Sequence, residues 1–210
     1  VRTAFGVVGS GNFHVTNALI AAGVRFVPAA HEGGAATMAD AYARTSGEPA
    51  VLSVHQGPGV TNALTGITEA AKSRTPVIVL APEATAVRSN FFIDLPACAA
   101  AVGADFRRVR SDHVDEDIAE AHRAATHGRG ATVVLGLPLD VQAAEAPERS
   151  SHDRSESPEP TAPAAQQVRQ LADLLRRSSR PVFIAGRGAT RQPERCLLYT
   201  SDAADEARSV

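Results

Sequence analysis

The sequence contains no tryptophan, one methionine, one lysine (Lys72) and two cysteines among its 210 residues. Cys98 and Cys196 form neither a metal-binding spacing nor a disulfide framework, which favours a reducing compartment such as the cytoplasm. No apolar run approaches the roughly 20 residues that span a bilayer, and no signal peptide is visible. The net charge of −2 provides no basic surface, so nucleic acid is not expected as a partner.

The composition that remains is typical of a soluble globular protein. Hydrophobic residues make up 44% of the chain and charged residues 21%, which argues against intrinsic disorder. The length suffices for one full domain and part of a second.

Short apolar runs alternate with segments of helical periodicity along the first two thirds of the chain. Strands are predicted over residues 4–8, 24–30, 50–54, 77–81, 105–109 and 132–137, and helices over residues 12–22, 32–45, 61–73, 96–102 and 115–126. Strict alternation of this kind predicts an α/β fold, with a doubly wound, parallel, six-stranded sheet flanked by helices. The run at 77–81 holds no polar residue, as expected of a central parallel strand.

The composition changes after residue 141. Residues 142–163 are rich in Glu, Ser, Pro and Ala without periodicity, which predicts an exposed linker between a domain at 1–141 and a second unit. Residues 164–194 combine an amphipathic helix with a strand over 181–185, which predicts the incomplete beginning of a second α/β domain. Residues 195–210 are predicted to be a non-native tail, and the chain is expected to be a truncated fragment.

The first candidate site is the loop Gly9-Ser-Gly-Asn-Phe-His14. It matches two glycines of the G-x-G-x-x-G dinucleotide fingerprint, and Glu32 lies near the distance at which that fingerprint has an acidic residue. His14 occupies the place of the third glycine, which disfavours a dinucleotide. A tight turn explains the glycines but leaves Asn12 and His14, which we expect to be exposed, unexplained.

The second candidate is the carboxylate of Glu32. The predicted strand at 24–30 delivers His31 and Glu32 to its carboxyl end, and Gly33 and Gly34 leave the adjoining backbone open. In an open α/β sheet, ligands bind at this edge. A plain alternative is that Glu32 is an acidic residue favoured by the helix dipole.

The third candidate is the segment from His55 to Asn62. Gly57-Pro58-Gly59 is expected to form a rigid loop that passes close to a ligand. Thr61 and Asn62 are expected at a helix N-terminus with free N–H groups, which suits an anion. The segment lacks the lysine and the length of a Walker loop, so a nucleoside triphosphate is not expected.

Several motifs together resemble the N-terminal, pyrimidine-binding domain of thiamine diphosphate-dependent enzymes, of the acetolactate synthase, pyruvate oxidase and benzoylformate decarboxylase-like group. The resemblance covers residues 4–141, and residues 164–189 are similar to the start of the family's central domain. The motifs are Phe5-Gly-Val-Val-Gly9, His31-Glu-Gly-Gly-Ala35, Ala39-Asp-Ala-Tyr-Ala-Arg44, Gly57-Pro-Gly-Val-Thr-Asn62, Leu64-Thr-Gly-Ile67 and Thr75-Pro-Val-Ile-Val-Leu80.

The resemblance implies a role for each candidate. Glu32 matches the glutamate that hydrogen-bonds the pyrimidine ring of thiamine diphosphate and favours the imino tautomer, whose nitrogen removes the thiazolium proton. The residues that match the cofactor-binding positions are Gly57, Pro58, Gly59 and Asn62, while Asn12, His14, His55 and Gln56 match substrate-side positions.

The family pattern also implies partners that this chain lacks. Mg²⁺ and the diphosphate belong to a C-terminal domain with a Gly-Asp-Gly motif that is absent here, so no metal ligands are assigned. The resemblance implies a 2-oxo acid substrate and a homodimer or homotetramer, and it leaves FAD open without support from the sequence. We expect the fragment alone to bind thiamine diphosphate weakly or not at all.

The sequence departs from acetolactate synthases at three places. His55-Gln56 replaces small hydroxyl residues, Pro82-Glu83 replaces Gly-Gln, and Phe91-Phe-Ile-Asp94 replaces Phe-Gln-Glu. A decarboxylase or carboligase other than acetolactate synthase therefore stays open. Two further hypotheses also stay open. The chain is either a non-catalytic pyrimidine domain that serves as an interaction module, or a dinucleotide-binding α/β protein.

Overall fold

The computed structural model describes residues 1–145 and 162–182. The chain divides into two compact units, Val1–Pro158 and Glu159–Val210. Each unit is described by itself.

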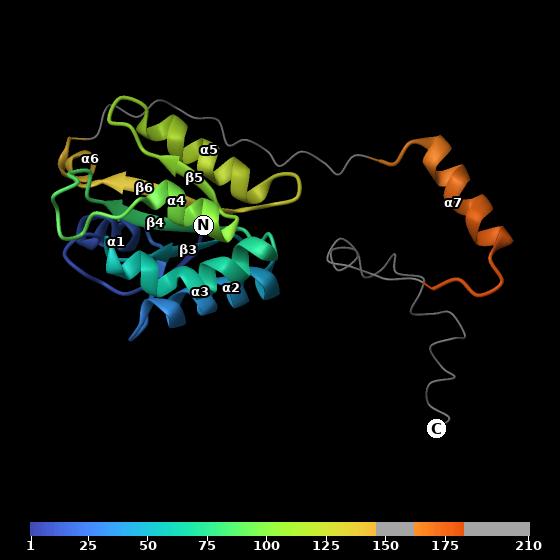
Figure 1. The fold of residues 1–210 in the computed structure, drawn as a ribbon, viewed down its shortest axis with the longest axis horizontal. Helices are drawn as coiled ribbons and strands as arrows, with labels where there is room; N and C mark the ends of the chain where they lie inside the picture. The colour runs from blue at the N-terminus through green and yellow to red at the C-terminus, as the bar shows by residue number, and fades with distance from the viewer. Residues whose placement is uncertain (146–161, 183–210) are drawn as a thin grey trace, which may run out of the picture. The chain divides into compact units, whose positions relative to one another are not determined.

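Six parallel strands form a single sheet in the first unit, in the order β2-β1-β3-β4-β6-β5 (Figure 1). The strands are β1 (Thr3–Gly6), β2 (Arg25–Pro28), β3 (Ala50–Ser53), β4 (Val77–Glu83), β5 (Asp105–Arg108) and β6 (Thr132–Pro138). The predicted doubly wound α/β sheet is confirmed, and the apolar strand β4 lies between β3 and β6 as its composition predicts.

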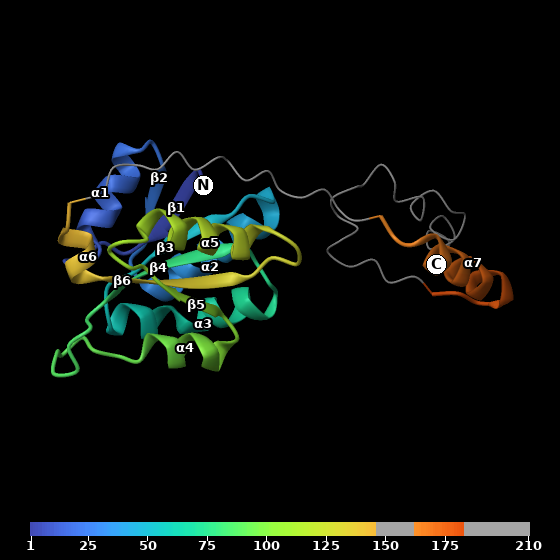
Figure 2. The ribbon, with the colours of Figure 1, turned by 90° about the horizontal axis from the view of Figure 1, so that it is seen from above.

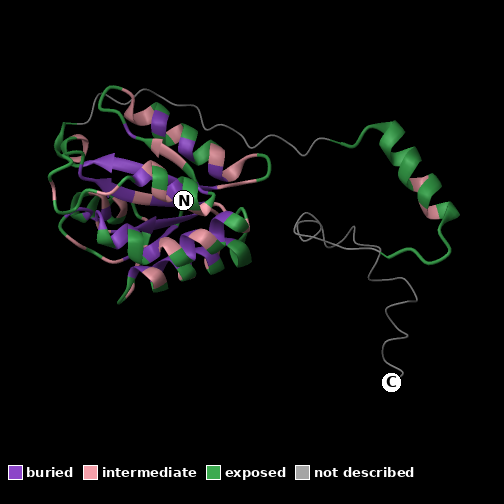
Figure 3. Ribbon diagram, viewed as in Figure 1, coloured by how far each residue is buried: buried purple, intermediate pink, exposed green. Residues whose placement is uncertain are grey.

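Helices cover both faces of the sheet (Figure 2). They are α1 (Phe13–Ala21), α2 (Glu32–Ser46), α3 (Pro58–Lys72), α4 (Leu95–Val102), α5 (Val114–Thr126) and α6 (Leu139–Ala143). Alternate strand residues point to opposite faces: Phe5, Leu52 and Val79 pack with α2, α3 and α4, whereas Ala4, Val51 and Ile78 pack with α1, α5 and α6. Burial follows this pattern, with the central strands buried on both faces (Figure 3).

Strand β4 is longer than predicted. It continues through Pro82 to Glu83, paired with β6, although the sequence predicted an irregular segment from Pro82 onward. The Leu80 carbonyl accepts a hydrogen bond from Val54 on the β3 side. Backbone groups of residues two apart point to the same side of a strand, so the backbone nitrogen of Pro82 also points toward β3. Strand β3 has already ended at Ser53, so the missing N–H of Pro82 removes no hydrogen bond from the sheet.

Helix α3 begins earlier than predicted. Gly57 is the N-cap with φ +60°, Pro58 stands at the first helical position, and Gly59 is already inside the first turn. Proline suits this position because its absent N–H would have no intrahelical partner. The prediction that Thr61 offers a free N–H is wrong, since this group donates to the Gly57 carbonyl at 3.3 Å.

Helix α6 was not predicted, and its last two residues, Gln142 and Ala143, fall inside the predicted linker. In the second unit, the predicted amphipathic helix is present as α7 (Ala165–Arg177). Most of the predicted strand at 181–185, the rest of the predicted domain and the predicted tail lie outside the described residues.

Candidate functional site

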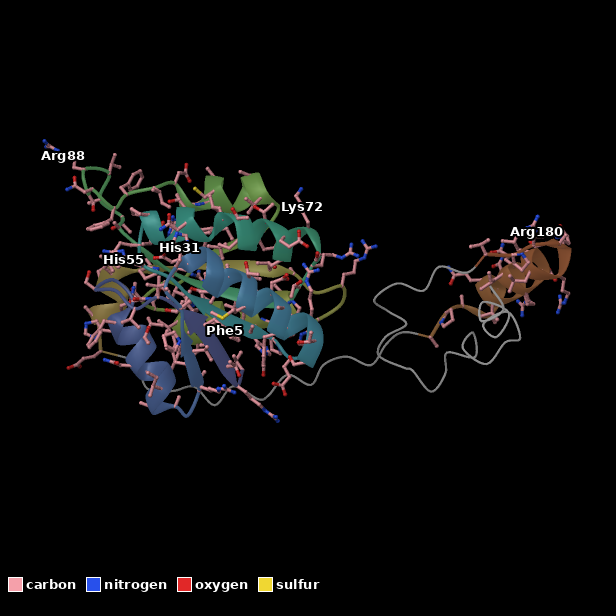
Figure 4. The ribbon with its side chains drawn as sticks, turned by 90° about the horizontal axis from the view of Figure 1, so that it is seen from below. Phe5, His31, His55, Lys72, Arg88 and Arg180 are labelled. Carbon is pink, nitrogen blue, oxygen red and sulfur yellow. The ribbon has the colours of Figure 1, made fainter. Side chains whose placement is uncertain are left out.

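The strand order brings three loops to the carboxyl edge of the sheet. Strands β2, β1 and β3 are neighbours, so the segments that follow them at residues 29–31, 7–12 and 54–57 end at the same edge. Figure 4 shows His31 and His55 at this end of the domain, with Lys72, the last residue of α3, toward the other end. The three candidate loops therefore meet at one edge.

Glu32 is the first residue of α2 and is 9% exposed. The preceding residue, His31, caps the helix by accepting a hydrogen bond at Nδ1 from the Gly33 N–H, at 3.0 Å. On the next helix, Asn62 donates from Nδ2 to Oε2 of Glu32, at 3.1 Å. Within the described part of the chain, no group donates a hydrogen bond to Oε1, so this oxygen is available to a ligand.

Gly59 allows the carboxylate and His55 to approach each other. A Cβ added at Gly59 would stand 2.9 Å from the His55 Cβ and 3.3 Å from the Glu32 Oε1. Gly57 has a similar role on the other side, because a Cβ there would stand 2.7 Å from the Phe91 carbonyl oxygen. At both positions a side chain would collide with neighbouring atoms, so glycine is required. Gly57 is also favoured because its φ is positive.

The His55 ring is held from three sides. Its Nδ1 lies 3.1 Å from the Gln56 carbonyl, which can only accept, so Nδ1 carries the proton. In the neutral ring Nε2 then accepts from the Ser10 hydroxyl, at 3.2 Å. The Phe91 ring contacts His55 edge-on, with centroids 5.3 Å apart.

Asn12 does not occupy the exposed position that the sequence predicted. The side chain is fully buried, and its amide group makes hydrogen bonds only within the protein. Gln56 is also buried, at 5% exposure, and lies over Gly11, where an added Cβ would overlap its Oε1. That Oε1 has no hydrogen-bond partner in the structure.

His14 is exposed on α1, against the edge of the Phe13 ring, and makes no hydrogen bond with the other candidates. The structure thus gathers Glu32, His55, Gln56, Asn62 and the Gly57-Pro58-Gly59 turn, and leaves His14 apart. Ser10 was missed by the sequence reasoning. Its position between two glycines at a strand end was the only available signal.

A surface pocket of the described residues lies away from these candidates. It has a volume of about 250 Å³ and is lined by Arg107, Glu120, Arg123 and Ala124, on β5 and α5. Strand β5 is at the opposite edge of the sheet from β2, and the Arg107 and Glu120 side chains form an ion pair there. Across residues 1–145 and 162–182, no group of three His, Cys, Asp or Glu side chains could hold a metal ion.

Comparison with known families gives the geometry its context. Residues 1–92 match the family model described as "Thiamine pyrophosphate enzyme, N-terminal TPP binding domain". The match spans β1 to β4 and therefore includes every candidate gathered at the sheet edge. Residues 1–92 belong to the family of N-terminal domains of thiamine pyrophosphate enzymes.

Relatives of this thiamine pyrophosphate enzyme domain extend the similarity beyond residue 92. A Pseudomonas aeruginosa protein named "Probable 2-ketoarginine decarboxylase" is 33% identical over 197 residues, which cover 90% of this chain and 35% of the relative. The catabolic acetolactate synthase of Raoultella terrigena is 31% identical over 205 residues, which cover 92% of this chain and 35% of the relative. A sulfoacetaldehyde acetyltransferase of Alcaligenes xylosoxydans is 42% identical over 83 residues, which cover 40% of this chain and 14% of the relative.

The fold has a counterpart among solved structures. The X-ray structure of a protein from Mycobacterium smegmatis, described as a thiamin diphosphate-dependent enzyme, superposes with a TM-score of 0.74 over 86% of this chain and 35% of its own, at 22% identity. This chain spans about a third of the length of the two long relatives. None of its described helices is both long enough and apolar enough to cross a membrane.

Proposed function

We propose that this chain is the N-terminal part of an enzyme that uses thiamine diphosphate to break or form a carbon–carbon bond beside the carbonyl of a 2-oxo acid. The observation that carries the proposal is the Glu32 carboxylate. It is buried at the start of α2 and held through Oε2 by Asn62, and no donor among residues 1–145 and 162–182 reaches Oε1. Relatives named as a decarboxylase and as an acetolactate synthase support this class of reaction.

The residues around Glu32 suit a flat heterocycle. Gly59 lies directly against Oε1, and a Cβ added at Gly34, on the first turn of the same helix, would meet no atom within 4 Å. A ring nitrogen could therefore approach Oε1 without meeting a side chain on these residues. Charge-assisted hydrogen bonds of this kind contribute about 1.5–3 kcal/mol.

Bound thiamine diphosphate supplies a carbon nucleophile once its thiazolium ring has lost a proton. The proposed role of this chain is to hold the pyrimidine ring. Glu32 would bind the ring, and the Gly57-Pro58-Gly59 turn and Asn62 would lie beside it. His55 is proposed as the substrate-side group, because its Cβ and the Glu32 Oε1 both border Gly59, and its Nδ1 faces the Gln56 carbonyl. Gln56 lies next to it, and the exposed His14 stays a weaker substrate-side candidate.

The complete protein would supply the rest of the site. Mg²⁺ and the diphosphate would be held by a domain outside this chain, and the site would form between two subunits of a homodimer or homotetramer. FAD has no assigned residue here, and a cytoplasmic location stays a prediction. Recovering the complete reading frame separates the enzyme from a non-catalytic module, because the enzyme must continue into a Gly-Asp-Gly domain.

Substitution of Glu32 tests the proposal in the complete protein. We expect Glu32→Gln to lower turnover of 2-oxo acids by about 10²–10⁴-fold, because proton-transfer assistance is of this size, while the fold is kept. The matched control is Glu116→Gln, the same change at an exposed carboxylate of α5. Turnover like that of the wild type in Glu32→Gln would contradict the assignment.

A further inference from the structure

Asn12 closes the turn that carries Ser10. Its Oδ1 accepts from the Gly9 N–H at 2.8 Å, and its own N–H donates to the Gly9 carbonyl at 3.3 Å. Asn12 thus fixes the turn over residues 9–12 through two hydrogen bonds to Gly9, and Ser10 lies within this turn. Because the side chain is fully buried, water cannot replace these bonds without rearrangement of the loop.

The same side chain ties this turn to strand β3. Asn12 Nδ2 donates to the Val7 carbonyl at 3.0 Å and to the Ser53 hydroxyl at 2.9 Å. Ser53 stands two residues before His55. The Val7 N–H also donates to the Ser53 carbonyl, at 3.3 Å, which keeps the two segments in register.

These contacts set the distance between Ser10 and His55. The Ser10 hydroxyl is exposed, comes from the loop after β1 and reaches His55 Nε2 at 3.2 Å, whereas His55 belongs to the loop after β3. The Asn12 to Ser53 bond is a buried side-chain connection between the loop after β1 and the last residue of β3, two residues before His55. Without it, Ser10 would be free to leave the imidazole.

We infer that Asn12 is a positioning residue, which holds the Ser10 hydroxyl on Nε2 of His55 and acts on the site only through that contact. Asn12 thus has no direct contact with a substrate, in contrast to the role that the family resemblance implied. The significance of the pair for catalysis rests on the proposed function. The geometry itself does not depend on the cofactor, so it is testable in the chain as it stands.

The test is the ¹⁵N NMR spectrum of the His55 ring in the 210-residue chain. In the wild type we expect Nδ1 protonated, through the Gln56 carbonyl, and Nε2 unprotonated with a donor on its lone pair. Ser10→Ala removes that donor from an exposed position, so the fold is kept and the Nε2 resonance shifts. Asn12→Asp retains the acceptor for Gly9 and can accept from the Ser53 hydroxyl, but it cannot donate to the Val7 carbonyl. Ser53→Ala is therefore made beside it, and we expect the same shift in Nε2 in both variants.

Two further variants decide whether Asn12 acts through Ser10. The double variant Ser10→Ala/Asn12→Asp should show no Nε2 shift beyond that of Ser10→Ala, because both changes remove one contact. Asn17→Asp, an exposed asparagine on the same helix, should leave the ring spectrum unchanged. Ser53→Ala removes the hydroxyl to which Asn12 donates, and with it a 3.5 Å contact to Thr16 Oγ1. It decides the question alone, with the same expectation, if Asn12→Asp unfolds the chain.

An Nε2 resonance that stays at its wild-type position in folded Asn12→Asp or Ser53→Ala would overturn the inference. So would a shift in the double variant equal to the sum of the single shifts. Neither result depends on Glu32 or on a cofactor, so failure of the proposed function would leave this measurement interpretable.

Discussion

Asp117 is a buried carboxylate whose partners all come from one residue. It accepts hydrogen bonds from the Arg110 backbone N–H at 2.8 Å, from its Nε at 3.2 Å and from its Nη2 at 2.8 Å. These bonds lower the pKa of Asp117 below its ordinary value, chiefly through the guanidinium. The charged form is therefore the one that stabilises the fold.

The lowered pKa predicts a pH-dependent stability. The contribution is present above the unfolded-state pKa of about 4 and is lost as the pH falls through the folded-state pKa. Asp117→Asn should lower the free energy of unfolding by about 1–2 kcal/mol at pH 7, since the pair is partly exposed on the Arg110 side. Denaturant titrations should show this difference shrinking toward pH 3, with the exposed Asp105→Asn as control. A difference that persists unchanged at pH 3 would contradict the account.

At the scale of elements, the pairing of α2 with α3 positions the proposed site. The two helices meet at the Glu32 to Asn62 bond near their N-terminal ends and at Gly66 in the middle. Near their C-terminal ends, Arg44 joins Asp40, Glu69 and Ser73. A Cβ at Gly66 would stand 2.5 Å from the Ala36 Cβ and 3.1 Å from backbone atoms, so only glycine allows this helix separation.

Gly66→Ala should therefore force the helices apart. We expect the free energy of unfolding to fall by about 1–2 kcal/mol, because overpacking outweighs the gain in helix propensity. Gly34→Ala, in an open position of α2, should be neutral or stabilise the fold by up to about 1 kcal/mol. Thermal unfolding of both variants provides the comparison, and equal effects at the two positions would contradict the packing argument.

The sequence predicted these elements better than their ends. Periodicity identified all six strands of the sheet and five of its six flanking helices, because alternation of apolar runs reflects burial on two faces. A proline after an apolar run predicts the end of a strand, but β4 continues through Pro82, because the neighbouring strand β3 stops first and local sequence does not reveal this. Asn12 was expected to be exposed, because a polar residue after two glycines usually is, and its buried partner Ser53 lies 41 residues away.

At the scale of the whole molecule, the proposed function assigns one side of a cofactor site to this chain. The chain spans about a third of its long relatives, and its described residues include no metal-binding cluster. In the proposed function Glu32 orients a pyrimidine ring, and none of the described residues forms a cluster that could hold a metal ion. The predicted consequence is that affinity for the cofactor resides largely outside this chain.

Calorimetry tests that division. Thiamine diphosphate with Mg²⁺ titrated into the 210-residue chain should give weak binding or none, whereas the complete protein should bind it in a Mg²⁺-dependent manner. Tight, Mg²⁺-dependent binding to the chain alone would show that the diphosphate site lies within it. NAD(H) and flavins serve as further ligands, and binding of either would favour a dinucleotide site at the first glycine loop instead.

The most direct measurement of the role of Glu32 is the exchange of the thiazolium proton of bound thiamine diphosphate with deuterium, followed by NMR after rapid acid quench in the complete protein. The account predicts that Glu32→Gln slows this exchange by about 10²-fold or more relative to the wild type and to Glu116→Gln, with the cofactor still bound. Exchange in Glu32→Gln at the wild-type rate would contradict the assignment of Glu32 as the residue that activates the cofactor.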